Sequence, residues 1–380
     1  MNDAVIVAAR RTPTGKREGV LSGIHPADLS AVVIEDLVTT TGIDPVVLDD
    51  VIWGNVTQAG EQTGDIARTA ALSAGLPESV PGVTVDRQCG SSQQSVHFAA
   101  AGLIAGHYDA VIAGGVESMS RNPMGSSLMG KSPYGERFLA RYDGVFPNQG
   151  IGAEMIAEQW GFDRTQLDEF AIESHERAAA ATDAGAFESQ IVPVETEHGT
   201  ITADEGIRRG GTVEGLAKLK TVFREDGVIT AGNASQISDG SAALLMMTSE
   251  KARELGLTPI ARVHTAVLAG TDPVIMLTGP IPATQKALRR SGLSMSDIGV
   301  FEVNEAFASV PLAWAKDLEA DTELMNPNGG AIALGHPLGG SGARLMTTIV
   351  HHMADKGIRY GLQTMCEGGG QANATILELL

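Results

Sequence analysis

Apolar and polar positions follow one order twice along this chain of 380 residues. In the first half, residues 26–41 have the spacing of an amphipathic helix, and residues 48–55 follow as a short turn and a buried strand ending in asparagine. In the second half, residues 282–291 and 296–304 repeat this order and again end in asparagine. The pattern therefore predicts helix, turn and strand at corresponding places in two halves.

The correspondence continues around two cysteines, each set beside glycine. An apolar strand leads into Cys89, an alanine-rich helix follows, and residues 110–113 form a further apolar strand. In the second half, a helix over residues 340–353 precedes a strand over 361–365 that ends at Cys366. Helices that alternate with short apolar strands indicate an α/β architecture. We expect two similar halves, with catalytic candidates at corresponding strand ends, where α/β sheets place their ligands.

A segment of different character, residues 119–238, separates the two halves. It begins with loops, continues as a helical stretch over residues 153–184, and is predicted to cover the two sheets and hold a substrate tail. The predicted domains are an N-terminal half over residues 1–118 with 239–258, a loop domain over 119–238, and a C-terminal half over 259–380.

One stretch of this segment, residues 125–132, matches the nucleotide-binding P-loop pattern letter for letter. That loop needs a buried strand before it and a helix N-terminus after it. Here the preceding residues are polar and Pro133 follows directly. We therefore expect no nucleotide triphosphate site.

Composition narrows the possible partners. The formal net charge of −19 argues against nucleic acid and anionic membranes as partners. No apolar run reaches the length of a membrane span, and the N-terminus lacks a signal-peptide layout, so a cytoplasmic protein without membrane insertion is expected. The two cysteines are expected to stay reduced, and no Cys/His cluster has metal-ligand spacing. An anionic substrate would need a local basic island. Arg208, Arg209, Lys218 and Lys220 form either such an island or an ordinary solvated loop.

Cys89 is a candidate nucleophile because it directly precedes a helix that begins near Ser91. A helix N-terminus is expected to lower the pKa of the thiol and to favour the thiolate. The alternative is an inert packing cysteine, but the adjacent glycine and serines favour a functional one. His336 lies in a Gly-His-Pro turn, and its place opposite Cys89 in the duplicated pattern suggests the base that takes the thiol proton.

Three further residues surround these two. Cys366 ends a strand and leads into Gly368, Gly369 and Gly370, whose free N–H groups can face a developing oxyanion. Its sulfur can exchange a proton with carbon, or it can be structural. Asn304 is either a helix cap or a group that holds a water near the site. Glu305 is either a charge at a helix N-terminus or a partner of His336.

These residues resemble the thiolases, CoA-dependent enzymes that make or cleave 3-oxoacyl-CoA. The resemblance covers the whole chain and rests on six blocks in the family's order: residues 89–91, 114–120, 231–235, 304–307, 335–337 and 366–370. The resemblance implies a thiolase fold, with two duplicated βαβαβαββ halves in a layered α/β/α/β/α core of two five-stranded sheets, plus an inserted loop domain.

The resemblance also implies roles. Cys89 would carry the acyl group, and His336 would activate Cys89 and act with a water held by Asn304. Cys366 would be the general acid and base, and N–H groups of Cys89 and Gly368 would form the oxyanion hole. Positions near the CoA substrate or its acyl group match Ser235, Ala231, Arg208, Met276 and Phe307. Coenzyme A and acyl-CoA would be substrates rather than permanently bound cofactors, and a homodimer or homotetramer is expected.

Some positions depart from the family pattern. Biosynthetic acetoacetyl-CoA thiolases usually have His-Met where this chain has Asn148 and Gln149, so strict short-chain specificity is not expected. Two alternative functions are less compatible with the sequence. A decarboxylating 3-oxoacyl synthase would have histidine at the place of Cys366. A non-catalytic CoA-binding or lipid-binding relative would lack one of Cys89, His336 and Cys366, and all three are present.

Overall fold

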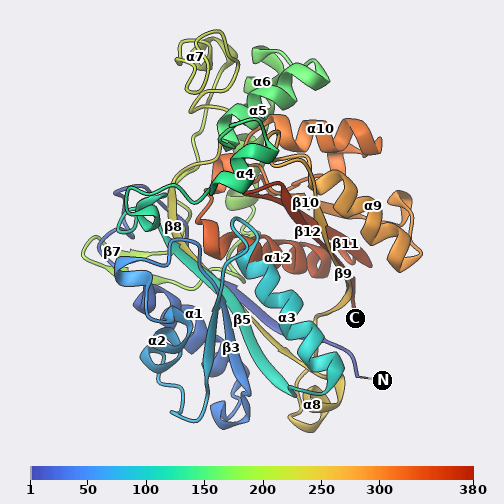
Figure 1. Cartoon of the computed structure of the whole chain (residues 1–380). Coiled ribbons are helices and arrows are strands. Elements are labelled where there is room, and N and C mark those ends of the chain that lie inside the picture. The colour runs from blue at the N-terminus through green and yellow to red at the C-terminus, as the bar shows by residue number, and fades with distance from the viewer. Residues whose placement is uncertain (1) are drawn as a thin grey trace.

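The computed structural model describes residues 2–380 and has five alternating layers of helix and sheet (Figure 1). The strands of its large sheet are β1 (Val5–Arg11), β2 (Gly15–Lys16), β3 (Asp50–Gly54), β4 (Gly82–Val85), β5 (Ala110–Ser118), β8 (Ser238–Met247), β9 (Ala261–Gly270), β10 (Val300–Val303), β11 (Tyr360–Glu367) and β12 (Gln371–Leu379). β6 (Val194–Thr196) and β7 (Gly199–Ile201) pair separately.

The large sheet joins two similar halves. Its order is β10-β11-β12-β9-β1-β8-β5-β3-β4, and β2 pairs with β8 beside this path. β3, β4 and β5 run parallel to one another, as do β10 and β11, while the central pairings are antiparallel. Within the sheet, the two halves are joined through β1 and β9, which share two residue pairs, Val5 with Arg262 and Ile6 with Ala261.

Five strands on each side were expected. The N-terminal half has them: β1, β8, β5, β3 and β4. The C-terminal half has four named strands, and an isolated parallel bridge between Phe301 and Met325 stands where its fifth would lie.

Helices cover both faces of this sheet. The outer helices are α1 (Pro26–Thr41), α2 (Ile66–Ser73), α8 (Ser249–Glu254), α9 (Pro280–Ser291) and α10 (Ser309–Leu318). The inner layer consists of α3 (Ser91–Ala105) and α12 (Leu338–Lys356), which lie side by side in the middle of the molecule (Figure 1). One buried apolar cluster, which includes Leu103, Ala343 and Met346, joins these two helices to strands of both halves. Such burial is the main stabilising contribution in a core of this kind.

Glycine allows α3 and α12 to approach closely. A Cβ atom added to Gly342 would lie 2.3 Å from the backbone nitrogen of Gln93 and 2.9 Å from its Cα. A Cβ on Gly339 would lie 2.4 Å from the carbonyl oxygen of Val116. The glycine-rich sequence after His336 thus lets α12 pack against α3 and the ends of β3 and β5.

The helices of the inserted segment lie at the top of the view in Figure 1, above the layered core. It contains α4 (Glu136–Arg141), α5 (Gln149–Trp160), α6 (Arg164–Asp183) and α7 (Val213–Leu216), and α11 (Ala331–Leu334) packs against α6. The helical stretch expected over residues 153–184 is two helices, because Gly161 adopts a left-handed conformation with φ of 71° and ends α5. The P-loop-like residues form a short turn over Ser126–Leu128, and no helix begins until Glu136, as expected.

Candidate active site

One cavity of about 690 Å³ brings together residues from all three parts of the chain. Cys89 comes from the N-terminal half, Ala231 and Ser235 from the inserted segment, and Phe307 and His336 from the C-terminal half. The remaining lining residues are Lys16, Arg17, Met119, Met124, Gln149, Glu205, Gly206, Arg208, Val222, Phe223, Thr230, Ala234, Gln236, Ile237, Leu277, Ala306 and Leu338.

Cys89 lies in a tight turn directly before α3, as the sequence predicted. The turn is held by hydrogen bonds from Gly90 N–H to Arg87 O and from Ser91 N–H to Gln88 O. Gln88 has φ of 48°, a conformation that costs free energy for a residue with a side chain. Cys89 is 7 % exposed and reaches the cavity at its buried end.

The expectation of a lowered thiol pKa at Cys89 is wrong. Burial raises the pKa of this thiol to about 12, and the carboxyl of Glu367 adds to the increase, while the backbone N–H of Gly368 acts in the opposite direction. Desolvation of a thiolate therefore outweighs the helix N-terminus here. Cys89 is therefore a neutral thiol at rest, which could act as a nucleophile only with the help of a base.

His336 has the hydrogen bonds of an oriented base. Its Nδ1 lies 2.6 Å from Ser341 Oγ, and that hydroxyl donates to the carbonyl of Pro337 at 2.8 Å. Ser341 has only one proton to give, so its oxygen accepts from Nδ1–H, and Nε2 is the unprotonated nitrogen. Asn304 Nδ2 lies 3.3 Å from Nε2, so the amide predicted to act beside His336 does contact it.

Burial lowers the pKa of His336 to about 3, and the nearby Arg344 cation contributes in the same direction. The ring is therefore neutral at physiological pH and can accept a proton. Asn304 Oδ1 is buried and has no hydrogen-bond partner within the described residues. It is free to bind a water or a substrate group beside His336.

Cys366 is fully buried at the end of β11 and packs behind the cavity wall with Met276 and Phe307. Burial raises the pKa of the Cys366 thiol, and the Cys89 sulfur is close enough to raise it further. Met276 is absent from the cavity lining, although its neighbour Leu277 is present. The two thiols thus approach each other from adjoining apolar clusters.

Gly368 begins the turn that follows Cys366. A Cβ atom there would lie 2.8 Å from Gln88 Oε1, so the turn packs directly on the loop that carries Cys89. Gly369 and Gly370 have φ of 81° and 75°, which favour glycine. This packing allows the Gly368 N–H to point at Cys89.

At the other end of the cavity, Arg208 lies with Lys16 and Arg17. Lys218 and Lys220, which were grouped with Arg208 as a possible basic island, do not line the cavity. Sequence reasoning missed Lys16 and Arg17, which are about 190 residues away from Arg208 along the chain. It missed Ser341 as well, since only its contact with His336 identifies it.

Glu305 has one of its two expected roles, a charge at a helix N-terminus, but the helix is α11 and not the one that follows Glu305 in sequence, since α10 begins only at Ser309. Its carboxylate accepts hydrogen bonds from Ser174 Oγ at 2.6 Å, from Asn326 Nδ2 at 2.9 Å and, in the first turn of α11, from the Ile332 N–H at 3.1 Å. It therefore ties α6 to α11, and none of these three partners is His336.

No metal-binding group of three or more His, Cys, Asp and Glu side chains occurs among residues 2–380. In the same range, no helix combines the length and apolar character needed to span a membrane.

Comparison with known proteins agrees with this arrangement. Residues 4–250 match the family described as thiolase, N-terminal domain, and residues 257–379 match thiolase, C-terminal domain. A steroid 3-ketoacyl-CoA thiolase of Mycobacterium tuberculosis is 49% identical over 100% of this chain and 95% of its own. A 3-ketoacyl-CoA thiolase of Pseudoalteromonas translucida is 46% identical over 100% and 99% of the two chains. The crystal structure of a Bacillus anthracis acetyl-CoA acetyltransferase has a TM-score of 0.91 at 38% identity and covers 100% and 99% of the two chains. The chain belongs to the thiolase family and is an acyltransferase that acts on CoA thioesters.

Proposed function

We propose that this thiolase cleaves 3-oxoacyl-CoA, and condenses acyl-CoA in reverse, through an acyl group carried on Cys89. The observation that supports this most directly is that Cys89 and His336 line one cavity whose wall backs onto Cys366. Such a set of nucleophile, base and second proton carrier suits two-step acyl transfer.

In the first step, Cys89 Sγ attacks the 3-oxo carbon as its proton passes to His336 Nε2. The bond between C2 and C3 of the substrate breaks, and acetyl-CoA leaves as an enolate that takes a proton from the Cys366 thiol at C2. His336 then returns the proton to the Cys366 thiolate, so that both are neutral again beside the acyl-enzyme. In the second step, the thiol of a new CoA gives its proton to His336 Nε2 and attacks the thioester, and Cys89 leaves and takes that proton from His336.

Both cysteines are neutral thiols at rest because burial raises the pKa of each. Charge is absent at rest and develops as the reaction proceeds, and the N–H of Gly368 faces the reacting sulfur of Cys89. One oxyanion donor of this kind is typically worth about 3 kcal/mol in the transition state.

Two measurements test these roles. Incubation with acetyl-CoA should leave a single acetyl group on Cys89 in an intact-mass spectrum, and Cys89→Ala should remove it. Cys366→Ser should keep this acylation and lose at least about 100-fold in carbon–carbon bond formation, as loss of a general acid–base does. A Cys366→Ser enzyme that condenses acetyl units at the normal rate would exclude the proton-transfer role.

We also propose that the acyl pocket accepts chains longer than acetyl. Asn148 caps α5 by accepting from the N–H groups of Gly150 and Ile151, so it serves the helix end. Gln149 lines the cavity and donates to Met124 Sδ at 3.5 Å. These two flexible side chains form a wall that can shift, and the relative with 49% identity is named for a bulky 3-ketoacyl-CoA.

A series of 3-oxoacyl-CoA substrates of increasing length tests this proposal. We expect kcat/KM to rise above that of acetoacetyl-CoA as the acyl group lengthens, because more apolar surface is buried on binding. Acetoacetyl-CoA as the best substrate would contradict it. Gln149→Met, which restores the residue of biosynthetic thiolases, should shift the preference toward short chains.

A further inference from the structure

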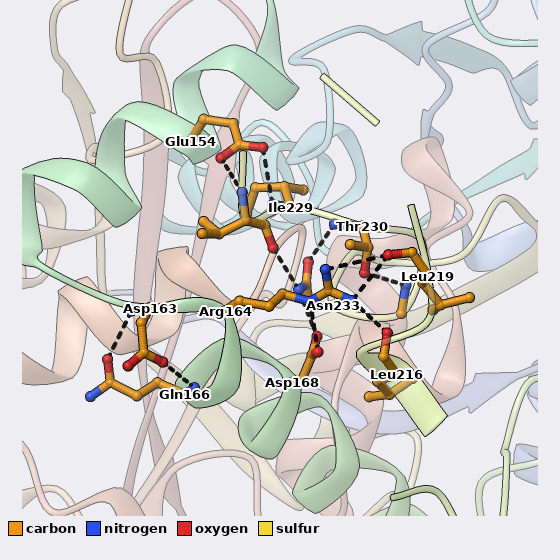
Figure 2. A network of polar contacts seen from close by, with 12 residues as sticks. Glu154, Asp163, Arg164, Gln166, Asp168, Leu216, Leu219, Ile229, Thr230 and Asn233 are labelled. Atoms are coloured by element: carbon orange, nitrogen blue, oxygen red, sulfur yellow. Dashed lines mark hydrogen bonds and ion pairs between the residues drawn. The ribbon is translucent and has the colours of Figure 1, made fainter. Parts of the chain in front are cut away.

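A polar network surrounds the segment 228–235 (Figure 2), which contributes Thr230, Ala231, Ala234 and Ser235 to the cavity wall. Its centre is Asn233, which lies in the wall segment 228–235 and is fully buried. The Asn233 side chain accepts from the Thr230 N–H at 2.9 Å and donates to Val228 O at 3.0 Å. It also donates to Asp168 Oδ1 at 2.9 Å. Asn233 therefore folds the wall segment and connects it to α6.

Asp168 connects two separate elements. Its side chain is 1% exposed, and its second oxygen, Oδ2, accepts from Arg164 Nε at 2.6 Å one helical turn away. Figure 2 shows Asp168 between the Arg164 guanidinium and Asn233. Each carboxylate oxygen thus has its own donor, and neither can be lost without leaving a buried donor unpaired.

Arg164 continues the chain of contacts outward. Its Nη2 donates to the carbonyl of Leu216, and both terminal nitrogens approach Leu219 O at 3.4 Å. These carbonyls belong to α7 and the loop after it. The side chains of Leu216 and Leu219 in turn pack over Gly232, where an added Cβ would lie 2.8 and 2.7 Å from their methyl groups.

A second carboxylate holds the start of the same wall. Glu154 on α5 is buried and accepts from the N–H groups of Val228 and Ile229 at 2.8 and 3.0 Å. At the far end, Ser235 N–H donates to Ala306 O, and Ala308 N–H donates to Asn233 O. The wall segment has no helix or strand of its own, so these side chains determine its shape.

We infer that Asp168 is a positioning residue for coenzyme A. It holds the wall segment 228–235 and the loop around α7 in the geometry that binds the CoA part of the substrate. This inference rests on the proposed function and on the expectation, from the resemblance to thiolases, that Ala231 and Ser235 lie beside CoA; both line the cavity. Asp168 itself is absent from the cavity lining. It acts through Asn233 on one side and Arg164 on the other.

Asp168→Asn tests the inference with the least change in volume. The asparagine side chain has a single acceptor oxygen, whereas Asn233 and Arg164 both donate to residue 168. One of these two hydrogen bonds must therefore be lost. We expect KM for CoA in thiolysis, and Kd for CoA by calorimetry, to rise about tenfold, the effect of an unpaired buried polar group. We expect kcat to change less than about threefold, because Cys89, His336 and Cys366 keep their surroundings.

A truncated substrate separates positioning from a general structural effect. Thiolysis of a 3-oxoacyl thioester of N-acetylcysteamine, with N-acetylcysteamine as acceptor, needs neither the nucleotide nor most of the pantetheine arm. Asp168→Asn should leave the kcat/KM of this truncated reaction nearly unchanged.

Hydrogen exchange of backbone amides in Asp168→Asn should speed up over residues 216–235 and stay unchanged over α12. The control is Glu173→Gln, the same chemical change on the same helix, in a half-exposed ion pair with Arg177. It should match the wild type in every assay.

Each outcome decides something. Unchanged CoA affinity in Asp168→Asn, or equal losses with CoA and the truncated substrate, would overturn the inference. If Asp168→Asn does not fold, Arg164→Gln serves in its place, since Arg164 is partly exposed and its loss should raise KM for CoA in the same direction. A wild-type enzyme that cleaves no 3-oxoacyl-CoA would refute the proposed function, while calorimetry with CoA would still test the role of Asp168.

Discussion

Ser341 is the residue on which the orientation of the His336 ring depends. It accepts from His336 Nδ1–H and gives its own proton to Pro337 O, so it selects the tautomer with a bare Nε2. Ser341 lies within α12, where a serine hydroxyl commonly donates to a backbone carbonyl four residues earlier. Because its only proton is used in that bond, the Ser341 oxygen acts as the acceptor for His336. A hydroxyl five residues after a histidine carries no signal in sequence. The contact exists only because α12 begins directly after the Gly-His-Pro turn.

Ser341→Ala should therefore lower kcat about tenfold while KM for CoA stays close to the wild-type value, since a buried N–H loses its acceptor. The matched control is Thr347→Val on the same helix, whose hydroxyl bonds only Ala343 O. Steady-state thiolysis of the two variants makes the comparison. Equal kcat in Ser341→Ala and the wild type would show that the tautomer is set by something else.

At the residue scale, sequence patterns predicted several residues that line the cavity and missed residues that hold them in place. Cys89, His336, Ser235 and Phe307 were each predicted from glycine-rich or family-like blocks, and all four line one cavity. Glu305 was expected at the N-terminus of the helix that follows it or beside His336, and it stands at the N-terminus of α11 instead, because its three hydrogen-bond partners come from distant segments. The thiol pKa of Cys89 was misjudged because a helix N-terminus is visible in sequence and desolvation is not.

At the scale of elements, the alternation of helices and apolar strands was predictable because each element carries its own period and its own end signals. α1 spans Pro26–Thr41 as expected, with proline at its start and Gly42 in the left-handed conformation at its end. β5 runs on to Ser118, through two glycines that were expected to end it. Those glycines are accommodated because the helix start at Gly339 packs directly over Gly115.

The wall segment 228–235 shows where element prediction reaches its limit. It has no periodic pattern, and its shape is set by Glu154 and Asp168, which precede it by about 70 residues. Both acids lie on helices where an isolated carboxylate normally indicates a solvated face. Their burial follows from the packing of the inserted segment over the cavity, which only the three-dimensional arrangement shows.

The whole molecule should respond to pH through four buried groups. Burial lowers the pKa of His97 and His336 to about 3, so these rings take up protons in the unfolded chain near 6.5 and stay neutral in the fold. Stability from this source is complete above pH 6.5 and falls as pH drops toward 3. Burial raises the pKa of Glu302 and Glu367 to about 8, so these carboxyls keep their protons in the fold and lose them near 4.5 when unfolded. Stability from that source falls as pH rises from 4.5 to 8.

These opposing trends place the maximum melting temperature between pH 4.5 and 6.5. Melting curves from pH 4 to 9 measure it directly. Glu302→Gln should flatten the decline between pH 6.5 and 8, whereas Glu197→Gln, which removes one exposed acid of the same kind, should not. A melting temperature that climbs steadily from pH 6.5 to 8 would contradict the assignment.

The union of the two halves has a genetic consequence. The sulfur that would carry the acyl group comes from one half, and the groups that would carry protons come from the other, within a single polypeptide. A cell that holds two defective alleles, one altered at Cys89 and the other at His336, would recover nothing when their products assemble together. Each working active site therefore needs one gene copy that encodes Cys89, His336 and Cys366 together.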